Sequence, residues 1–310
     1  MNSAIAIYCL TLCHISLVLL WLLRRRHSTG RSLARLQYSR QLTAILLQEP
    51  DDFDKINIRT HNARERMALA EAIYTIISHS YGCDIQLLRH IALKNQLPQM
   101  LRRRTRWARG ARRAWLLMLQ SAIPTAEGSA EELKRYLKSR DSDVRISALL
   151  AMLASRPTMA IRTISALEYE LSPFDIARII SLLRRGLLPI AYEPLLADGN
   201  SNLQMLGMAI VRSFGIGIAE KRLHQIITSE RNPAIVSQAI YTLSSLGRPL
   251  GHTRIRERLA AMTSQERKAL CRHLSVEGYS LGAVRGIFTE QESDYAEVLI
   301  NSYKRALARS

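Results

Sequence analysis

One pattern of apolar residues occurs three times in this chain, and it constrains the fold more than any other feature of the sequence. Counted from Asp141, from Asn200 and from Asn232, apolar or small residues fill the offsets 3, 7, 8 and 11. They are Val144, Ala148, Leu149 and Met152, then Leu203, Gly207, Met208 and Val211, then Ile235, Ala239, Ile240 and Leu243. These offsets mark one face of an amphipathic helix. The pattern therefore predicts three equivalent helices, each of which buries that face.

A shorter helical segment precedes each of these helices, which predicts a chain of helix pairs. We expect the second helix of each pair to begin near residue 141, 171, 200, 232 or 263, roughly 30 residues apart, which is room for two short helices and two turns. Further starts are marked by Thr263 with Glu266 and by Thr289 with Glu292, because a Thr followed three residues later by Glu caps a helix N-terminus. Each helix pair in such an array buries its core against the neighbouring pairs. The length of the chain therefore reflects the number of repeats and need not reflect separate domains.

One copy of the pattern carries a family resemblance. The motif Asp141-x-Asp143-Val144-Arg145-x-x-Ala148 resembles the second-helix signature of HEAT repeats, and the spacing near 30 is similar to that of HEAT-like repeats in bacteria and in phycobilisome lyases. The resemblance covers about residues 130–280, and residues 63–125 join the array by helical pattern alone. It implies a right-handed α-α superhelix, a HEAT-like solenoid, and a scaffold or adaptor role, since HEAT arrays seldom carry catalysis.

The composition supports an all-α fold. Hydrophobic residues make up 47% of the chain, which suffices for a packed interior, whereas the aromatic share of 6% argues against a sheet-rich protein. The four cysteines are Cys9, Cys13, Cys83 and Cys271. Their spacing provides neither a disulfide framework nor a C-x-x-C zinc pair, which fits a reducing compartment.

The N-terminal segment predicts a single transmembrane helix. Ile5–Leu23 is an apolar run of 19 residues, and such a helix would be about 28 Å long, close to the thickness of the hydrocarbon core. The arginines that follow the run are Arg24, Arg25 and Arg26, and no basic residue precedes it. Positive charge marks the cytoplasmic side, so we expect the N-terminus outside and the remainder in the cytoplasm. The same three arginines would contact anionic lipid headgroups.

A secretory signal peptide is the alternative interpretation of this run. It would need a basic segment before the apolar residues and a small-residue cleavage site after them. The sequence instead has Met1–Ala4 before the run and the arginine cluster after it. We therefore expect an uncleaved, single-pass protein of the plasma (inner) membrane.

These observations predict that the chain is divided into three parts. Residues 1–27 are expected to form the transmembrane anchor with its basic flank, and residues 28–62 a juxtamembrane helix and a linker. Residues 63–310 are expected to form the HEAT-like α-solenoid. Pro50 and the acidic run Asp51–Asp54 interrupt the helical pattern and mark the linker.

The net charge of +18 is concentrated in two stretches. Residues 1–48 hold six arginines and no acid, and residues 85–126 hold eight arginines, one lysine and no acid. In a continuous helix over residues 101–119, four of these arginines would lie within about 60° of one another. They are Arg102, Arg106, Arg109 and Arg113, opposite a packed face of Trp107, Ala111, Ala114, Trp115 and Met118. Such a basic ridge either binds an acidic protein, lipid headgroups or nucleic acid, or is a solvated helix face.

No arrangement of residues in the sequence predicts catalysis. The eight histidines form no H-x-x-x-H or H-E-x-x-H pair for a metal ion. Gly215-Ile-Gly217 and the spaced glycines Gly278, Gly282 and Gly286 neither follow a predicted strand nor precede the Lys-Ser/Thr of a phosphate-binding loop. We therefore expect no catalytic residues, no cofactor and no metal site.

These expectations favour one function over two others. The first is a non-enzymatic, membrane-anchored cytoplasmic scaffold or adaptor that binds a protein partner through its repeat surface, with an envelope or secretion assembly as its expected setting. The second is a membrane-tethered nucleic-acid-binding protein that uses the basic helix from Arg102 to Arg113. The third is a lyase-like enzyme similar to the bilin lyases that share this type of repeat.

Overall fold

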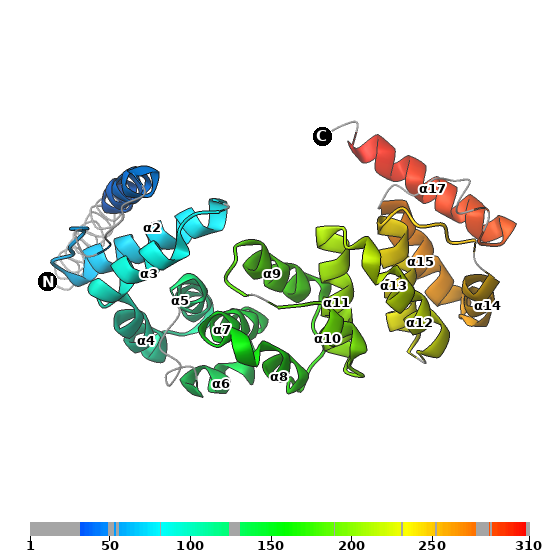
Figure 1. The fold of residues 1–310 in the computed structure, drawn as a ribbon, viewed down its shortest axis with the longest axis horizontal. Coiled ribbons are helices and arrows are strands. Elements are labelled where there is room, and N and C mark those ends of the chain that lie inside the picture. Colours follow the sequence, from blue (N-terminus) through cyan, green and yellow to red (C-terminus); the bar gives the residue numbers. More distant parts are fainter. Residues whose placement is uncertain are drawn as a thin grey trace, which may run out of the picture. The chain divides into compact units, whose positions relative to one another are not determined.

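The structure is a computed structural model that describes residues 32–48, 53, 56–80, 82–123, 131–188, 190–230, 232–251, 253–276, 285 and 287–307. Within these ranges the chain is α-helical with short 3-10 turns and contains no strand (Figure 1), so the predicted all-α class is confirmed. The apolar run Ile5–Leu23 and the arginines from Arg24 to Arg26 lie outside the described residues. Among the described helices, none is by itself long and apolar enough to cross a membrane, and one bent pair, Ser142–Ser155 with Pro157–Ser165, reaches that length and composition in combination.

The chain divides into two compact units. Unit 1 comprises Met1–Pro157 with Leu182–Leu188, and unit 2 comprises Thr158–Ser181 with Pro189–Ser310. Unit 1 contains a helix over residues 32–48, α2 (Ala63–His79), α3 (Ile85–Lys94), α4 (Leu97–Trp107), α5 (Gly110–Ala122), α6 (Glu131–Leu137) and α7 (Ser142–Ser155). Helix α5 packs on both α2 and α7, while α3 packs on α4 and α6 packs on α7. Unit 1 therefore stacks its helices in two layers.

Unit 2 repeats this two-layer arrangement. Its elements are α8 (Ala160–Ser165), α9 (Pro173–Arg184, whose last turn belongs to unit 1), α10 (Glu193–Ala197), α11 (Ser201–Phe214), α12 (Glu220–Ser229), α13 (Pro233–Ser245), α14 (Thr253–Ala261), α15 (Ser264–Val276) and α17 (Glu290–Leu307), with 3-10 turns at Pro157–Met159 and Gly217–Ala219. Helix α13 packs on both α11 and α15 in one layer, and α12 packs on α14 in the other. Contacts between α12 and α13 join the two layers.

The three predicted repeat helices are present and begin at the expected caps. The side chains of Asp141, Asn200 and Asn232 accept hydrogen bonds from backbone N–H groups in the first turns of α7, α11 and α13. All the residues that the pattern places on the inner face are buried: Val144, Ala148, Leu149, Met152, Leu203, Gly207, Met208, Val211, Ile235, Ala239, Ile240 and Leu243. The starts predicted near residues 171 and 263 also correspond to helices, at Pro173 and at Ser264.

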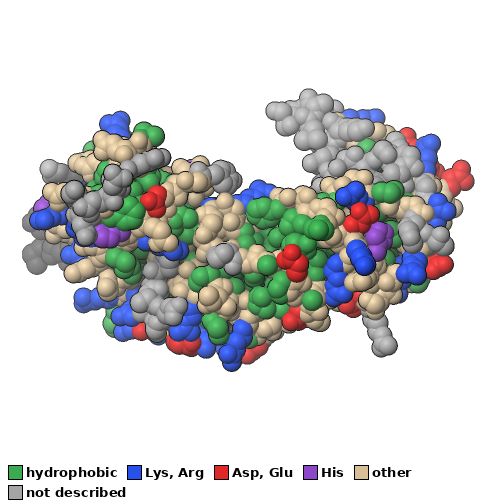
Figure 2. Space-filling view, in the orientation of Figure 1, with side chains coloured by type: hydrophobic (Ala, Val, Ile, Leu, Met, Phe, Trp, Pro, Cys, Tyr) green, Lys and Arg blue, Asp and Glu red, His purple; other side chains and the backbone are tan. Residues whose placement is uncertain are grey.

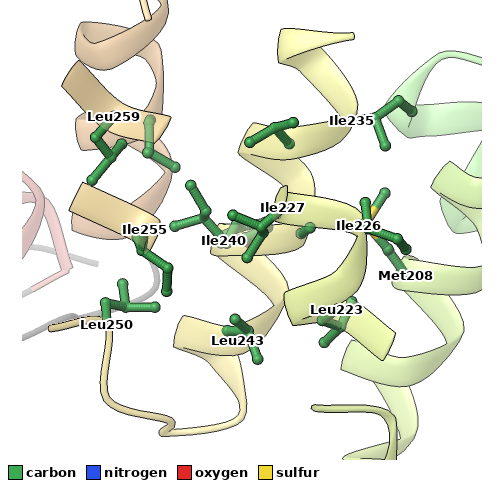
Figure 3. Packing of buried hydrophobic residues seen from close by; sticks show 14 of the residues in the cluster. Met208, Leu223, Ile226, Ile227, Ile235, Ile240, Leu243, Leu250, Ile255 and Leu259 are labelled. Carbon is green, nitrogen blue, oxygen red and sulfur yellow. The ribbon is translucent and has the colours of Figure 1, made fainter. Parts of the chain in front are cut away.

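The core of unit 2 lies between its two layers (Figure 3). Leu223 and Ile227 of α12, Ile240 and Leu243 of α13, and Ile255 of α14 all lie within this core and are at most 2% exposed. Burial of one such side chain contributes about 1.5–3 kcal/mol relative to its exposure to water. This core therefore joins consecutive helix pairs directly.

The segment between the first described helix and α2 is held against the body of unit 1. Ile56 and Ile58 are 7% and 5% exposed, and their carbonyl oxygens accept hydrogen bonds from Lys94 Nζ at 3.0 Å and from Asn95 Nδ2 at 2.9 Å. Thr60 Oγ1 donates to Asn95 Oδ1 at 3.0 Å. Residues 56–60, predicted as part of a linker, therefore lie bonded to the C-terminal end of α3.

Candidate binding groove

The predicted basic ridge does not exist as the face of one helix. The helical path ends at Trp107 and resumes at Gly110, because Ala108 and Arg109 are extended and Gly110 has a φ of +49°. A positive φ is accessible to glycine without the steric cost that a side chain adds. The prediction of a continuous helix over residues 101–119 is therefore wrong, and α4 and α5 point in different directions (Figure 1).

The break redistributes the four predicted arginines. Arg102 and Arg106 lie on α4, with guanidinium nitrogens 3.9 Å and 3.3 Å from carboxylate oxygens of Glu132 on α6. Arg113 of α5 lies over the ring of Tyr136, 5.2 Å from its centroid, and Arg109 is exposed at the N-cap of α5. Three of the four side chains are thus directed to α6, where exposed ion pairs contribute about 0–1 kcal/mol each.

The side chains predicted to pack behind the ridge are also partly displaced. Ala114 is buried and Met118 is half-buried, as expected, whereas Ala111 is exposed and Trp107 and Trp115 are 80% and 38% exposed. Trp115 contacts Tyr74 of α2 edge to face, with ring centroids 5.2 Å apart. The break rotates α5 relative to α4, so the two tryptophans no longer share one inward face.

A different set of arginines surrounds a groove in unit 1. The groove has a volume of about 540 Å³ and lies between the N-terminal turn of α2, the length of α4 and the beginning of α5. Its lining residues are Ala63, Arg66, Gln96, Gln99, Met100, Arg103, Arg104, Trp107, Ala108 and Arg112. We call this site the basic groove, because four of these residues are arginines and none is acidic.

Arg104 is fixed inside the basic groove. Its Nη2 donates a hydrogen bond to the backbone carbonyl oxygen of Ala63 at 3.1 Å, which connects α4 to the start of α2. Partial burial lowers the pKa of the Arg104 guanidinium, and the nearby positive charges of Arg112 and Arg66 lower it further. The guanidinium groups therefore repel one another across the groove, and no acidic residue in the lining offsets this repulsion.

Trp107 supplies an apolar surface beside these charges. Its side chain is 80% exposed, although an indole ring buries a large area when it is covered. It follows Arg103 by one turn on α4, and Met100 and Ala108 add further apolar surface to the lining. The basic groove thus combines fixed positive charge with an uncovered aromatic ring.

One backbone feature at the groove carries strain. Gln96 has a φ of +56°, the sole positive φ at a residue other than glycine within the described ranges, and it precedes α4 without a side-chain cap. A non-glycine residue in this left-handed conformation costs about 1–2 kcal/mol. Strained residues of this kind cluster at binding and switch sites, and Gln96 lines the groove.

The described residues offer little basis for other chemistry. No group of three His, Cys, Asp or Glu side chains in the described ranges is placed to hold a metal ion. A second groove, between α15 and α17, contains Arg267, but Glu292 Oε1 accepts from its Nε at 2.7 Å. Charge in that groove is therefore balanced, unlike in the basic groove.

The groove residues come from the predicted basic stretch and from one helix outside it. Arg103, Arg104 and Arg112 belong to the basic stretch of residues 85–126, but none of them is among the four arginines of the predicted ridge. Arg66 comes from α2, and no local signal connects it to α4. The signal in the sequence for the separation of α4 from α5 is Gly110, since a glycine weakens a helical pattern.

Comparison with protein-family models, with curated proteins and with solved structures finds no match to this chain.

Proposed function

We propose that this protein is a non-enzymatic scaffold that binds an acidic segment of a partner protein in the basic groove. The observation that carries the proposal is the grouping of Arg66, Arg103, Arg104 and Arg112 around an exposed tryptophan, with no acidic residue in the lining. Such a site focuses positive potential and favours a ligand with several negative charges. Removal of the mutual repulsion among the arginines adds to the favourable free energy of binding.

The proposal includes the fold that carries the groove and the anchor that holds it at the membrane. The two-layer stacking in each unit and the three equivalent repeat helices support a HEAT-like solenoid, and we include its right-handed superhelix in the proposal. Anchoring by Ile5–Leu23, with headgroup contacts through Arg24, Arg25 and Arg26, is supported by the apolar run and its flanking charge. The scaffold would thus present its groove on the cytoplasmic side of the inner membrane.

An acidic protein segment fits the groove better than a nucleic acid duplex does. Arginine binds carboxylates in a bidentate geometry, and the apolar surface of Trp107 and Met100 can accommodate a hydrophobic side chain beside those carboxylates. A phosphate backbone requires a basic stripe that continues along the surface. The arginines next along α4, Arg102 and Arg106, are instead paired with Glu132.

The experiment compares two variants of equal charge. The groove variant carries Arg66→Gln, Arg103→Gln and Arg112→Gln, and retains Arg104 because of its hydrogen bond to Ala63. The control variant carries Arg102→Gln, Arg106→Gln and Arg109→Gln. Both variants lose three positive charges, and all of these except that of Arg66 come from the basic stretch of residues 85–126. Binding of a fluorescein-labelled peptide of alternating Glu and Leu is measured by anisotropy, beside a labelled single-stranded oligonucleotide.

We expect the groove variant to lose at least about tenfold in peptide affinity, equivalent to 1.4 kcal/mol, while the control loses less than threefold. Equal losses in the two variants would indicate unspecific attraction and contradict the proposal. Tighter binding of the oligonucleotide that depends steeply on salt concentration would favour the nucleic-acid alternative, in which the bases stack on Trp107.

A further inference from the structure

The helix over residues 32–48 presents two different faces. Tyr38 and Leu42 are 8% and 0% exposed and pack against the rest of unit 1, where the Tyr38 hydroxyl lies 3.4 Å from the carbonyl oxygen of Arg59 and 3.5 Å from Glu65 Oε2. Leu33, Leu36 and Leu47 are 64%, 50% and 81% exposed. The helix is therefore attached to the protein by one side and leaves three leucines uncovered.

The uncovered leucines form one stripe. At 100° per residue they fall within about 60° of one another, on the side opposite Tyr38 and Leu42. Arg40 lies in the middle of the stripe and is exposed. In Figure 2, hydrophobic and basic side chains lie side by side over this helix, at the upper left. We call this face, composed of Leu33, Leu36, Arg40 and Leu47, the leucine stripe.

We propose that the leucine stripe lies in the interface of an anionic lipid bilayer, as a second membrane contact beside the apolar run. Interfacial helices insert their apolar face to the boundary of headgroups and acyl chains, while long basic side chains extend to the phosphate groups. The stripe has this composition, with leucines for the acyl boundary and Arg40 for an anionic headgroup.

The position of the helix in the chain argues for a bilayer over other occupants. Eight residues separate Leu23 from Ser32, and an extended chain of that length reaches about 30 Å at most. Residues 1–48 carry six arginines and no acid, which repels a second copy of the same region and attracts anionic lipid. Insertion requires no loss of packing, because Tyr38 and Leu42 keep their contacts with unit 1.

The inference rests on the proposed anchoring by Ile5–Leu23, so the test reports the two contacts separately. The full chain is reconstituted in vesicles of phosphatidylcholine and phosphatidylglycerol, and flotation reports anchoring. An environment-sensitive fluorescent amino acid replaces Leu36 in one protein and Gln41 in the control, since Gln41 is exposed on the same helix but outside the stripe. Quenching by spin-labelled lipids then reports contact with the bilayer.

We expect the fluorescent amino acid at position 36 to show a blue-shifted emission. Spin-labelled lipid should quench this emission at least twofold more strongly than the emission at position 41. Addition of Arg40→Glu should weaken the quenching at position 36. Flotation without preferential quenching at position 36 overturns the stripe contact and leaves the anchoring intact. A blue shift at position 36 that lipid does not quench assigns the stripe to a protein contact and also overturns the inference. Failure to float overturns the anchoring and the stripe contact together.

Discussion

Arg104 and Ala63 are joined by a hydrogen bond of 3.1 Å between the guanidinium Nη2 and the backbone carbonyl oxygen. The bond connects two helices that lie far apart in the sequence and places a positive charge on the wall of the basic groove. Burial lowers the pKa of this guanidinium, and the charges of Arg112 and Arg66 lower it further. The groove therefore keeps its charges together through a polar contact of the backbone, without a neutralising acid.

The first prediction concerns the cost of this repulsion. A base whose pKa falls on folding destabilises the native state at every pH at which it stays protonated. Burial is the largest cause of the lowered pKa of Arg104, so removal of the neighbouring charge should relieve only the smaller part of the cost that comes from repulsion. We expect Arg112→Gln to leave the free energy of unfolding unchanged or to raise it by less than about 1 kcal/mol, because these groups are partly exposed and screened by salt. Arg104→Gln should instead destabilise the protein by about 0.5–1.5 kcal/mol, because the hydrogen bond that joins α4 to the start of α2 is lost. Urea unfolding at low and high salt measures both, and a destabilising Arg112→Gln would contradict the repulsion.

The second prediction concerns the attachment of residues 56–60. Asn95 is 8% exposed, and its Nδ2 donates to the carbonyl oxygens of Ile58 and Ile91 at 2.9 Å and 3.0 Å. We expect Asn95→Ala to lower the free energy of unfolding by about 1–3 kcal/mol, because the carbonyl group of Ile58 loses its donor and the Ile91 carbonyl retains only the backbone N–H of residue 95. Thr60→Val removes only the hydrogen bond from Thr60 to Asn95, so it should lower the free energy of unfolding by less than Asn95→Ala does. Hydrogen exchange of residues 56–60 should accelerate in the first variant, and unchanged exchange would argue against this attachment.

The third prediction concerns the close approach of α11 to α10. A Cβ atom at Gly207 would lie 2.9 Å from Leu196 Cδ2 and 3.0 Å from Leu195 Cβ. We expect Gly207→Ala to destabilise the protein by about 1–3 kcal/mol, as overpacking of a buried contact does. Gly199→Ala is the matched control, because a Cβ atom at that position would meet nothing within 4 Å. Thermal unfolding followed by circular dichroism distinguishes the two, and equal melting temperatures would refute the close approach.

The fourth prediction concerns the core between α5, α6 and α7. Ala148 is fully buried beside Leu117, Val144 and Met152. Ala148→Glu introduces a carboxylate that has no partner there, so we expect a loss of more than about 3 kcal/mol, if the protein folds at all. Ser142→Glu adds the same charge at an exposed position in the first turn of α7, where the helix dipole favours it. Solubility and helical content should therefore fall in the first variant alone.

The fifth prediction concerns the reactivity of Cys271. Burial, and then the negative charge of Glu292, raise the pKa of this thiol to about 12 from an ordinary value of 9.0. Because the pKa of Cys271 is higher in the folded protein than in the unfolded chain, the protonated thiol contributes to the free energy of unfolding. This contribution is fully present below pH 9 and is lost as the pH rises from about 9 to about 12. We expect Cys271 to resist iodoacetamide at pH 8.5 in the native protein and to react after unfolding, as measured by peptide mass spectrometry. Cys83 is partly exposed and should react first, so equal rates would contradict the burial of Cys271.

The repeat helices could be predicted because their determinants are local. Asp141, Asn200 and Asn232 each cap a helix with their own side chain, and the apolar residues follow each cap at fixed offsets. The burial of Leu203 or Ala239 follows from that periodicity alone. Helical periodicity also predicted a helix within residues 28–62, and the described residues 32–48 are helical.

The basic groove could not be predicted, because it depends on one glycine and on a distant helix. Gly110 interrupts a segment whose side chains otherwise follow helical periodicity, and a break of two residues suffices to separate α4 from α5. Which arginines then face one another depends on the packing of α2, to which Arg66 belongs. The pairing of Arg106 with Glu132 likewise joins positions 26 apart in the sequence, so no local pattern could have distinguished it from a solvated arginine.

The hydrogen bonds between residues 56–60 and the end of α3 also have a mechanical consequence. A pulling force on the chain before residue 56 would load the bonds from Lys94 and Asn95 to the segment before it reached α2. The Tyr38 and Leu42 contacts would share that load, because the helix over residues 32–48 rests on the same unit. Tension applied at the N-terminal side would thus be absorbed ahead of the repeat core, and the arginines of the groove would keep their spacing under load.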